Sequence, residues 1–242
     1  GLYAANMPAE VGGAGLDTLT WVLYEKELGR ANYALHWTCV ARPSNILLAC
    51  EGEQREKYLF PAVRGEKPDC LAMSEPGVGS DLQSVKTSAV KDGEGYYTVN
   101  GAKTFITNGW NADLVITVAK TNPALGAKGT SLILLERGMP GFERGKRLKK
   151  LGLKAQDTSE LFFDNVKVPE ANLLGAEGQG FVYLMQELPW ERMQIAIGAT
   201  ASAEAAVEST LAYTRERKAF GPEVFKFQNT RFKLAELKTE IQ

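Results

Sequence analysis

The stretch AMSEPGVGSDL, residues 72–82, combines two hydroxyl side chains with a proline and two glycines. The Pro-Gly pair at 76–77 predicts a tight turn, and Gly79 lets the backbone approach a ligand because no Cβ stands in the way. Ser74, Ser80 and successive main-chain N–H groups could serve a carbonyl or a phosphate. The stretch lacks the third glycine and the βαβ unit of a dinucleotide-binding fingerprint. Taken alone, it fits either a ligand-binding loop or a plain loop.

A second stretch, GAKTFITNG at residues 101–109, leaves an expected strand and ends in an Asn-Gly turn. If the segment is extended, Phe105 and Thr107 point to the same side. One flat ring and one hydroxyl on a common face could stack on a planar cofactor and form a hydrogen bond with it. In isolation, a packed aromatic side chain and a turn threonine explain the pattern equally well.

A single histidine, His36, and three cysteines restrict the remaining chemistry. One histidine excludes a multi-histidine metal site, so no metal is expected, and we expect His36 to be a partly buried or capping residue. An odd number of cysteines without CxxC spacing favours reduced thiols inside a cell. The net charge of −1 gives no electrostatic attraction for nucleic acid or an anionic membrane. The apolar runs fall short of the ~20 residues that span a bilayer.

These residues must be positioned by elements that the hydrophobic pattern predicts. Asp17 or Thr18 is expected to cap a helix that runs to Leu28, where Gly29 stops it. A second, amphipathic helix is expected over 53–63, with a proline that ends or kinks it. The first third of the chain is therefore expected to be helical.

The middle third changes to the period of a β-sheet, with strands expected over 85–91, 96–100, 114–120, 130–136 and 160–168. The first two are joined by Asp-Gly-Glu-Gly, which is a strong hairpin signal. Because no helix of about 10–15 residues separates these strands, we expect an antiparallel barrel or sandwich rather than a parallel nucleotide-binding sheet. A basic stretch over 144–154 is expected to be a solvated loop or a sheet edge.

The last third is helical again. Small and apolar residues recur at helical spacing over 179–217, interrupted by Pro189, and a turn at 221–222 precedes a second helix from about Glu223. We therefore expect an α+β protein of three parts: a helical N-terminal domain over 1–66, a central antiparallel β-barrel or sandwich over 67–174, and the first helices of a C-terminal helical domain over 175–242.

Taken together, the motifs resemble the acyl-CoA dehydrogenase family over essentially the whole chain. They occur in the family's order and spacing: EKYL at 56–59 leading into AMSEPGVGSDL, NGAKTFITNG at 100–109, KLGL at 150–153 with Asp157-Thr158, FDNVKVP at 163–169, and RKAFG at 217–221. Several separated matches in register are far more specific than any one of them.

The resemblance implies an FAD cofactor held by the central and C-terminal domains together with a neighbouring subunit. The positions that match the family's flavin loop are Leu71, Met73, Ser74, Gly79 and Ser80. In the family, the position of Ser80 also lies near the pantetheine arm of the CoA thioester.

The resemblance assigns two further groups to the cofactor. Phe105, Ile106 and Thr107 match the second flavin segment, in which the threonine hydroxyl faces the reactive flavin nitrogen. The positions that reach the FAD of an adjacent subunit are matched by Arg217, Phe220 and Gln228. Phe227 stands where many members carry histidine, which weakens that one contact.

The catalytic base of most members is a glutamate beyond the position of residue 242, but some branches carry it on the long helix, directly before an arginine. This sequence reads Glu187-Leu-Pro-Trp-Glu191-Arg192, which is most similar to the long-chain branch. The resemblance therefore implies Glu191 as the base, and Leu188 and Arg192 as substrate-side residues. Pro189 replaces an aspartate that many members place here, so that substrate contact is not expected.

Helix geometry supports Glu191 independently. It falls on the stripe of Leu184, Leu188 and Ile195, and its neighbours three and four residues away include no basic side chain. Apolar surroundings and the like charge of Glu187 would both raise its pKa, as a general base near neutrality requires. A glutamate paired with an arginine of another helix is the alternative.

The function implied is oxidation of an acyl-CoA thioester to the trans-2-enoyl-CoA, with electrons passed to an electron-transfer flavoprotein. The alternatives are an acyl-CoA oxidase or flavin monooxygenase on the same scaffold, and a non-catalytic acyl-CoA- or flavin-binding fragment. A homodimer or homotetramer, in a bacterial cytoplasm or a mitochondrial matrix, is expected. The ends of the chain suggest a segment cut at both ends, which by itself is expected to be inactive.

Overall fold

The computed structural model describes residues 3–31 and 42–242, so the prediction for His36 lies outside the described residues. The chain divides into two compact units, each described by itself. The first consists of Gly1–Leu16 and Val40–Leu188, and the second of Asp17–Cys39 and Pro189–Gln242.

Short helical segments begin the first unit. They are 3-10 turns at Ala9–Val11 and Asn45–Ala49, a π-helical turn at Arg55–Leu59, and the helix α3 at Phe60–Val63. The amphipathic helix expected over 53–63 is present, with Tyr58, Leu59 and Val63 buried. The proline follows the π-helical turn within this continuous helical run, and the helix ends two residues after it, at Val63.

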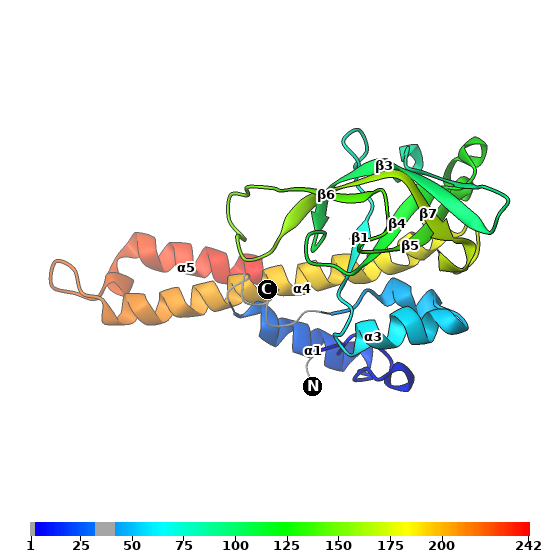
Figure 1. Ribbon diagram of the computed structural model, residues 1–242. Coiled ribbons are helices and arrows are strands. Elements are labelled where there is room, and N and C mark those ends of the chain that lie inside the picture. The colour runs from blue at the N-terminus through cyan, green and yellow to red at the C-terminus, as the bar shows by residue number, and fades with distance from the viewer. Residues whose placement is uncertain (1–2, 32–41) are drawn as a thin grey trace. The chain divides into compact units, whose positions relative to one another are not determined.

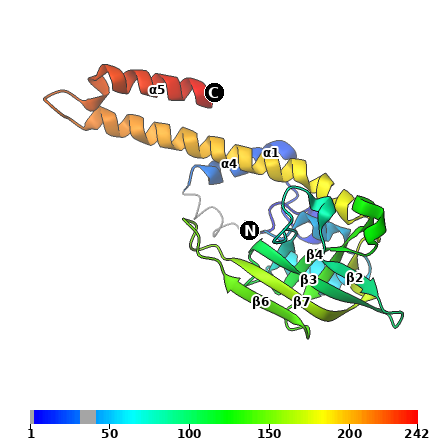
Figure 2. The same ribbon diagram turned by 90° about the horizontal axis from the view of Figure 1, so that it is seen from above.

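The first unit also contains a sheet of eight strands, in which β3 and β7 run side by side (Figure 2). The strands are β1 (Asp69–Ala72), β2 (Ser88–Lys91), β3 (Tyr96–Thr107), β4 (Leu114–Lys120), β5 (Thr130–Glu136), β6 (Phe142–Arg147), β7 (Thr158–Pro169) and β8 (Leu173–Leu174). Their order is β6-β7-β3-β2-β4-β5-β8, with β1 paired to β4. The hairpin expected between β2 and β3 is present, and the carboxylate of Asp92 accepts the N–H groups of Glu94 and Tyr96 in its turn.

The α+β class is confirmed, but the sheet is mixed and its path does not close into a barrel. Both β1 and β2 pair parallel with β4. A parallel pair needs a long crossover, and here the segment that contains β2 and β3 supplies it in place of a helix. Three residues of the basic stretch, Arg144, Lys146 and Arg147, lie on β6, which is the first strand in the order of the sheet. Part of the basic stretch therefore belongs to a sheet edge.

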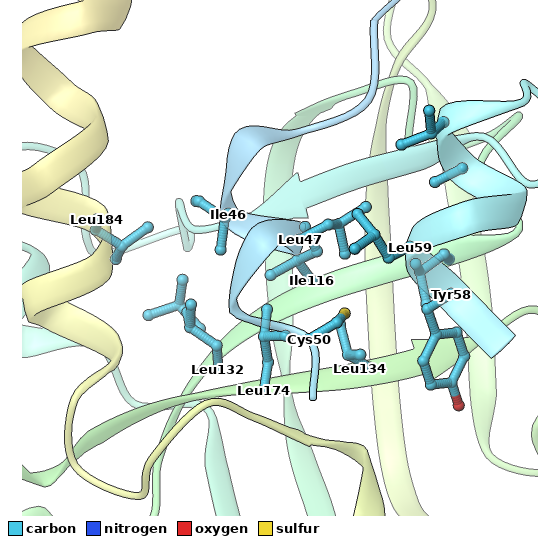
Figure 3. Close-up of a cluster of buried hydrophobic side chains, with 14 of the residues drawn as sticks. Ile46, Leu47, Cys50, Tyr58, Leu59, Ile116, Leu132, Leu134, Leu174 and Leu184 are labelled. Carbon is cyan, nitrogen blue, oxygen red and sulfur yellow. The ribbon is translucent and has the colours of Figure 1, made fainter. Parts of the chain in front are cut away.

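Apolar side chains cover both faces of β4 and β5. Alternate residues, including Ile116, Leu132 and Leu134, pack against the helical segments and against Leu184 (Figure 3). The intervening residues, such as Val115 and Ile133, pack on the other face, in a cluster shared with β3 and β7. Because both of its faces are covered, β4 is buried along its whole length. The buried strand gives rigid support to the loop that follows β1 and to the end of β3.

The second unit is helical. It contains α1 (Thr18–Gly29), the C-terminal part of α4 (Gly180–Glu216) and α5 (Gln228–Ile241); α4 and α5 form a hairpin (Figure 1). The carboxylate of Asp17 caps α1 by accepting the N–H of Thr20 at 2.8 Å. The long helix predicted over 179–217 is present as α4, and it continues through Pro189.

The helix α1 ends at Gly29, where the sequence predicts its stop. This glycine is the last helical residue, and a Cβ added there would lie 2.8 Å from Cα of Gly198. Its carbonyl oxygen accepts the hydroxyl of Ser202 at 2.6 Å, and the flanking Lys26 pairs with Glu204 at 2.9 Å. Glycine at position 29 therefore permits close packing of α1 against α4.

Within residues 3–31 and 42–242, no helix combines the length and the apolar character needed to cross a bilayer. No cluster of three or more His, Cys, Asp or Glu side chains there could hold a metal ion.

Candidate active site

The loop that follows β1 carries the first group of candidate residues. Glu75 and Val78 exchange main-chain hydrogen bonds of 2.9 and 3.0 Å across Pro76 and Gly77, so the predicted tight turn is confirmed. Leu71, Met73 and Ser74, before the turn, are half-buried, whereas Gly79 and Ser80, after it, are exposed. A Cβ at Gly79 would find no atom within 4 Å, so the space beside this backbone is open.

The end of β3 carries the second group. The pairing of β3 with β7 shifts register between Lys103 and Ile106, which makes a bulge. Phe105 lies in the bulge with a left-handed φ of 58°, and 69% of its surface is exposed. A bulky residue in this region is strained, and such strain is concentrated at functional sites.

The three residues predicted to contact the cofactor here are not equivalent. Phe105 and Thr107 are exposed, whereas the side chain of Ile106 is buried in the core shared by β3, β4 and β7. Any contact of Ile106 with a ligand must therefore be made through its main chain.

The structure brings the two groups together. The N–H of Thr104 donates to the carbonyl oxygen of Ser74 at 2.9 Å, and the ammonium of Lys103 donates to the carbonyl oxygen of Met73 at 3.0 Å. The loop after β1 is thus held directly beside the bulge of β3. An exposed ring and an exposed hydroxyl of β3 therefore lie next to the loop that carries Ser74.

The turn that follows Thr107 is held by Asp157. Its carboxylate accepts the N–H of Trp110 at 2.8 Å and the side-chain amide of Asn111 at 2.9 Å, and its carbonyl oxygen accepts the N–H of Asn108 at 3.2 Å. Asp157 therefore determines the conformation of the chain directly after the candidate segment.

In the second unit, the connection between α4 and α5 carries a third group. Arg217, Phe220 and Gln228 are all exposed, and Phe220 is 99% exposed with a left-handed φ of 55°. The ring of Phe227 packs edge-on against that of Phe220, with centroids 6.5 Å apart. The structure thus gathers these three predicted residues at one end of the helical hairpin, where their side chains are accessible.

The long helix α4 carries the predicted base. Glu191 and Arg192 are exposed and Leu188 is half-buried. Of the apolar stripe expected around Glu191, Leu184 is buried but Ile195 is 62% exposed, so the described residues do not cover the stripe along its length. The carboxylate of Glu187 accepts the side-chain amide of Asn45 at 3.1 Å. The roles of Glu191, Leu188 and Arg192 stay predictions.

Sequence reasoning missed three residues that organise this site: Glu75, Lys103 and Asp157. The signal available in the sequence was a lysine, Lys103, in the GAKTFITNG stretch that directly follows the strand expected over 96–100. It could not identify Glu75 as the partner, because the two residues are far apart in the chain and meet only in the folded sheet.

Comparison with known proteins places the chain in a family. Models of the acyl-CoA dehydrogenase N-terminal, middle and C-terminal domains match residues 1–66, 70–166 and 178–242. The chain therefore belongs to the acyl-CoA dehydrogenase family.

Relatives match the whole chain. The mitochondrial long-chain specific acyl-CoA dehydrogenase of Rattus norvegicus is 46% identical over 248 residues, which cover 100% of this chain and 57% of the rat protein. An acyl-CoA dehydrogenase of Bacillus subtilis is 40% identical, covering 100% of this chain and 65% of its own length. The chain thus spans less than two thirds of these relatives.

Solved structures share the fold. An acyl-CoA dehydrogenase from Geobacillus kaustophilus matches with a TM-score of 0.88 and 44% identity, covering 98% of this chain and 64% of that one. Butyryl-CoA dehydrogenase from Megasphaera elsdenii matches with a TM-score of 0.88 and 38% identity, covering 100% and 65%.

Proposed function

We propose that the protein is an FAD-dependent acyl-CoA dehydrogenase that converts an acyl-CoA thioester to the trans-2-enoyl-CoA. The observation that carries the proposal is the hydrogen bond between Thr104 and Ser74. It holds together, in a chain of this family, the two segments assigned to the flavin.

The residues present suit FAD. An exposed aromatic ring on a strained bulge, exposed hydroxyls at Thr107 and Ser80, and open space at Gly79 would accommodate a flat polar ring and its substituents. The exposed Arg217, Phe220 and Gln228 would reach the cofactor of an adjacent subunit. A solved FAD complex of PigA, 29% identical to this chain, has the same fold with a TM-score of 0.90.

The residues of this chain have separate roles in the proposed reaction. Bound FAD supplies the acceptor for the hydride that leaves the β-carbon. The carboxylate of Glu191 takes the α-proton, which requires it to face the thioester as a general base. The hydroxyl of Thr107 would donate a hydrogen bond to the bound flavin. Ser80, Leu188 and Arg192 orient the substrate, Ser80 beside the pantetheine arm.

The same proposal covers the protein's partners and location. Electron-transfer flavoprotein accepts the electrons, a homodimer or homotetramer completes the FAD site, and the protein acts in a bacterial cytoplasm or a mitochondrial matrix. A structure described as the electron transferring flavoprotein of Acidaminococcus fermentans contains a chain 36% identical to this one. The three domains are proposed to meet at residues 66–67 and 174–175.

A second candidate is an oxidase on the same scaffold. The prolyl acyl carrier protein oxidase AnaB is 35% identical to this chain and matches it with a TM-score of 0.89. This likeness to a protein described as an oxidase supports the second candidate. Rapid reoxidation of the reduced protein by oxygen alone would favour this candidate, and slow reoxidation would favour the dehydrogenase.

The test mixes FAD-loaded full-length protein anaerobically with butyryl-, octanoyl- or palmitoyl-CoA. We expect the flavin absorbance to bleach and trans-2-enoyl-CoA to form. A Glu191→Gln variant should bleach about 10²–10⁴-fold more slowly, because the carboxylate that takes the proton is gone.

Glu187→Gln is the matched control, since it removes a carboxylate four residues away on the same helix. It should slow the reaction far less than Glu191→Gln does, because it removes a neighbouring charge and leaves in place the carboxylate that takes the proton. Near-normal turnover of Glu191→Gln would remove that residue from the role of base. Protein that neither contains nor takes up FAD would overturn the proposed function altogether.

A further inference from the structure

A buried ion pair lies beneath the candidate flavin loop. Nζ of Lys103 is 2.9 Å from Oε1 of Glu75, and the two side chains are 0% and 6% exposed. Burying two charges is costly, and a well-packed apolar pair is often at least as stable. Stability alone therefore does not explain why charged residues occupy this position. The fixed geometry of their hydrogen bonds does explain it.

The lysine connects three elements. From β3, its ammonium donates to the carbonyl oxygens of Met73 at 3.0 Å and Val118 at 2.7 Å, in addition to Glu75. An ammonium has three donors, and all three are used. Two of the three acceptors belong to the loop after β1, so Lys103 ties the main chain of this loop to β3 and β4.

The glutamate makes a matching set of bonds. Its carboxylate accepts the N–H of Lys86 at 2.7 Å and that of Thr87 at 3.0 Å. Burial by itself would raise the pKa of Glu75, but the N–H of Thr87 and the ammonium of Lys103 hold that pKa below its usual range. Glu75 is thus ionised at neutral pH and holds the far side of the loop to the segment that enters β2.

We propose that the Lys103–Glu75 ion pair positions the flavin ring site by setting the main chain of Met73 and Ser74 against the exposed end of β3. The inference rests on the proposed function. Both residues act through the main chain of the loop and not by touching the cofactor. They are therefore positioning residues, and a change in either should alter how FAD is held as well as how stable the protein is.

The test compares Lys103→Met with Lys120→Met. Lys120 is also a buried lysine of the same sheet, but its ammonium donates to Thr130 at 3.0 Å and to the carbonyl oxygen of Gly126, not to the loop. We expect Lys103→Met to weaken FAD binding about tenfold or more and to shift the flavin absorption spectrum. Lys120→Met should lower the melting temperature without either change.

A pH series gives a second readout, which can be made on the unaltered protein. Burial lowers the pKa of Lys103 to about 8, and Glu75 is the charged group that faces it among the described residues. FAD affinity of the unaltered protein should therefore fall as the pH rises through about 8, because the ammonium that donates to Met73 loses its proton. In Lys103→Met this dependence should be absent.

Glu75→Gln keeps the size of the side chain and removes its charge, and it decides the question if Lys103→Met fails to fold. A loss of FAD affinity and the same spectral shift would support the proposal. Unchanged affinity and spectrum in the folded variants would overturn it while leaving the proposed function intact. Unaltered protein that binds no FAD would instead overturn the proposed function, and the inference with it.

Discussion

The N–H of Thr104 donates to the carbonyl oxygen of Ser74 over 2.9 Å, and the bond joins the bulge of β3 to the loop after β1. Each segment alone is consistent with an ordinary loop or turn. Their contact puts an exposed ring, an exposed hydroxyl and an open backbone at one place in the fold.

Thr107→Val should weaken FAD binding about tenfold and slow flavin reduction by acyl-CoA, because a methyl group replaces the hydroxyl at nearly constant shape. FAD titration and anaerobic stopped-flow measurements check this. Thr98→Val, on the same strand but away from the bulge, is the control and should leave both quantities unchanged. Normal flavin reduction in Thr107→Val would contradict the assigned role.

Asp157→Ala should lower the free energy of unfolding by about 1–3 kcal/mol, because the part-buried N–H of Trp110 loses its acceptor. The loosened turn after Thr107 should also be cleaved faster by a protease. Urea unfolding and limited proteolysis measure the two effects. Asp164→Ala removes an exposed carboxylate that accepts the amide of Asn165, and it should cost far less. Equal losses in both variants would contradict the prediction.

The Asp69→Asn variant should gain stability relative to the unaltered protein as the pH rises. Burial raises the pKa of Asp69 from 3.8 to about 7, against hydrogen bonds from main-chain N–H groups such as that of Ser44. The pKa of Asp69 is higher in the folded protein than in the unfolded chain, so the protonated side chain favours folding. This contribution to the free energy of unfolding is complete below about pH 4 and is lost as the pH rises through 7. At pH 8 the variant should therefore exceed the unaltered protein by on the order of 2 kcal/mol.

Urea unfolding at pH 5 and pH 8 measures this difference. Asp92→Asn is a control of opposite sign, because the ammonium of Lys167 and the N–H of Glu94 hold the pKa of Asp92 below its usual value. Removing that charge should destabilise the protein at pH 8. An Asp69→Asn variant that is less stable at pH 8 than at pH 5, relative to the unaltered protein, would refute the assignment.

Gly29→Ala should destabilise the second unit, because the added Cβ would lie 2.8 Å from Cα and 2.9 Å from the carbonyl oxygen of Gly198. Overpacking of this kind costs about 1–3 kcal/mol, offset in part by the better helix propensity of alanine. Thermal unfolding measures the effect. Gly77→Ala, where a Cβ meets nothing within 4 Å, is the control and should change stability little. A neutral Gly29→Ala would show that α1 and α4 separate at little cost.

The sequence by itself determined much of the local structure. The strands at 114–120 and 130–136, the turn at 76–77 and the Asp17 cap all follow from interactions between near neighbours, and the structure confirms them. The motifs also identified the family. These features depend on periodicity, turn residues and short-range hydrogen bonds, all of which can be seen in one stretch of chain.

Only the tertiary structure decided how the stretches meet. The parallel pairing of β1 with β4, the bulge that exposes Phe105 and buries Ile106, and the burial of Lys103 against Glu75 each depend on segments far apart in the chain. Packing against such segments overrides local preference. The residue types were visible in the sequence, but their distances are set by the folded core.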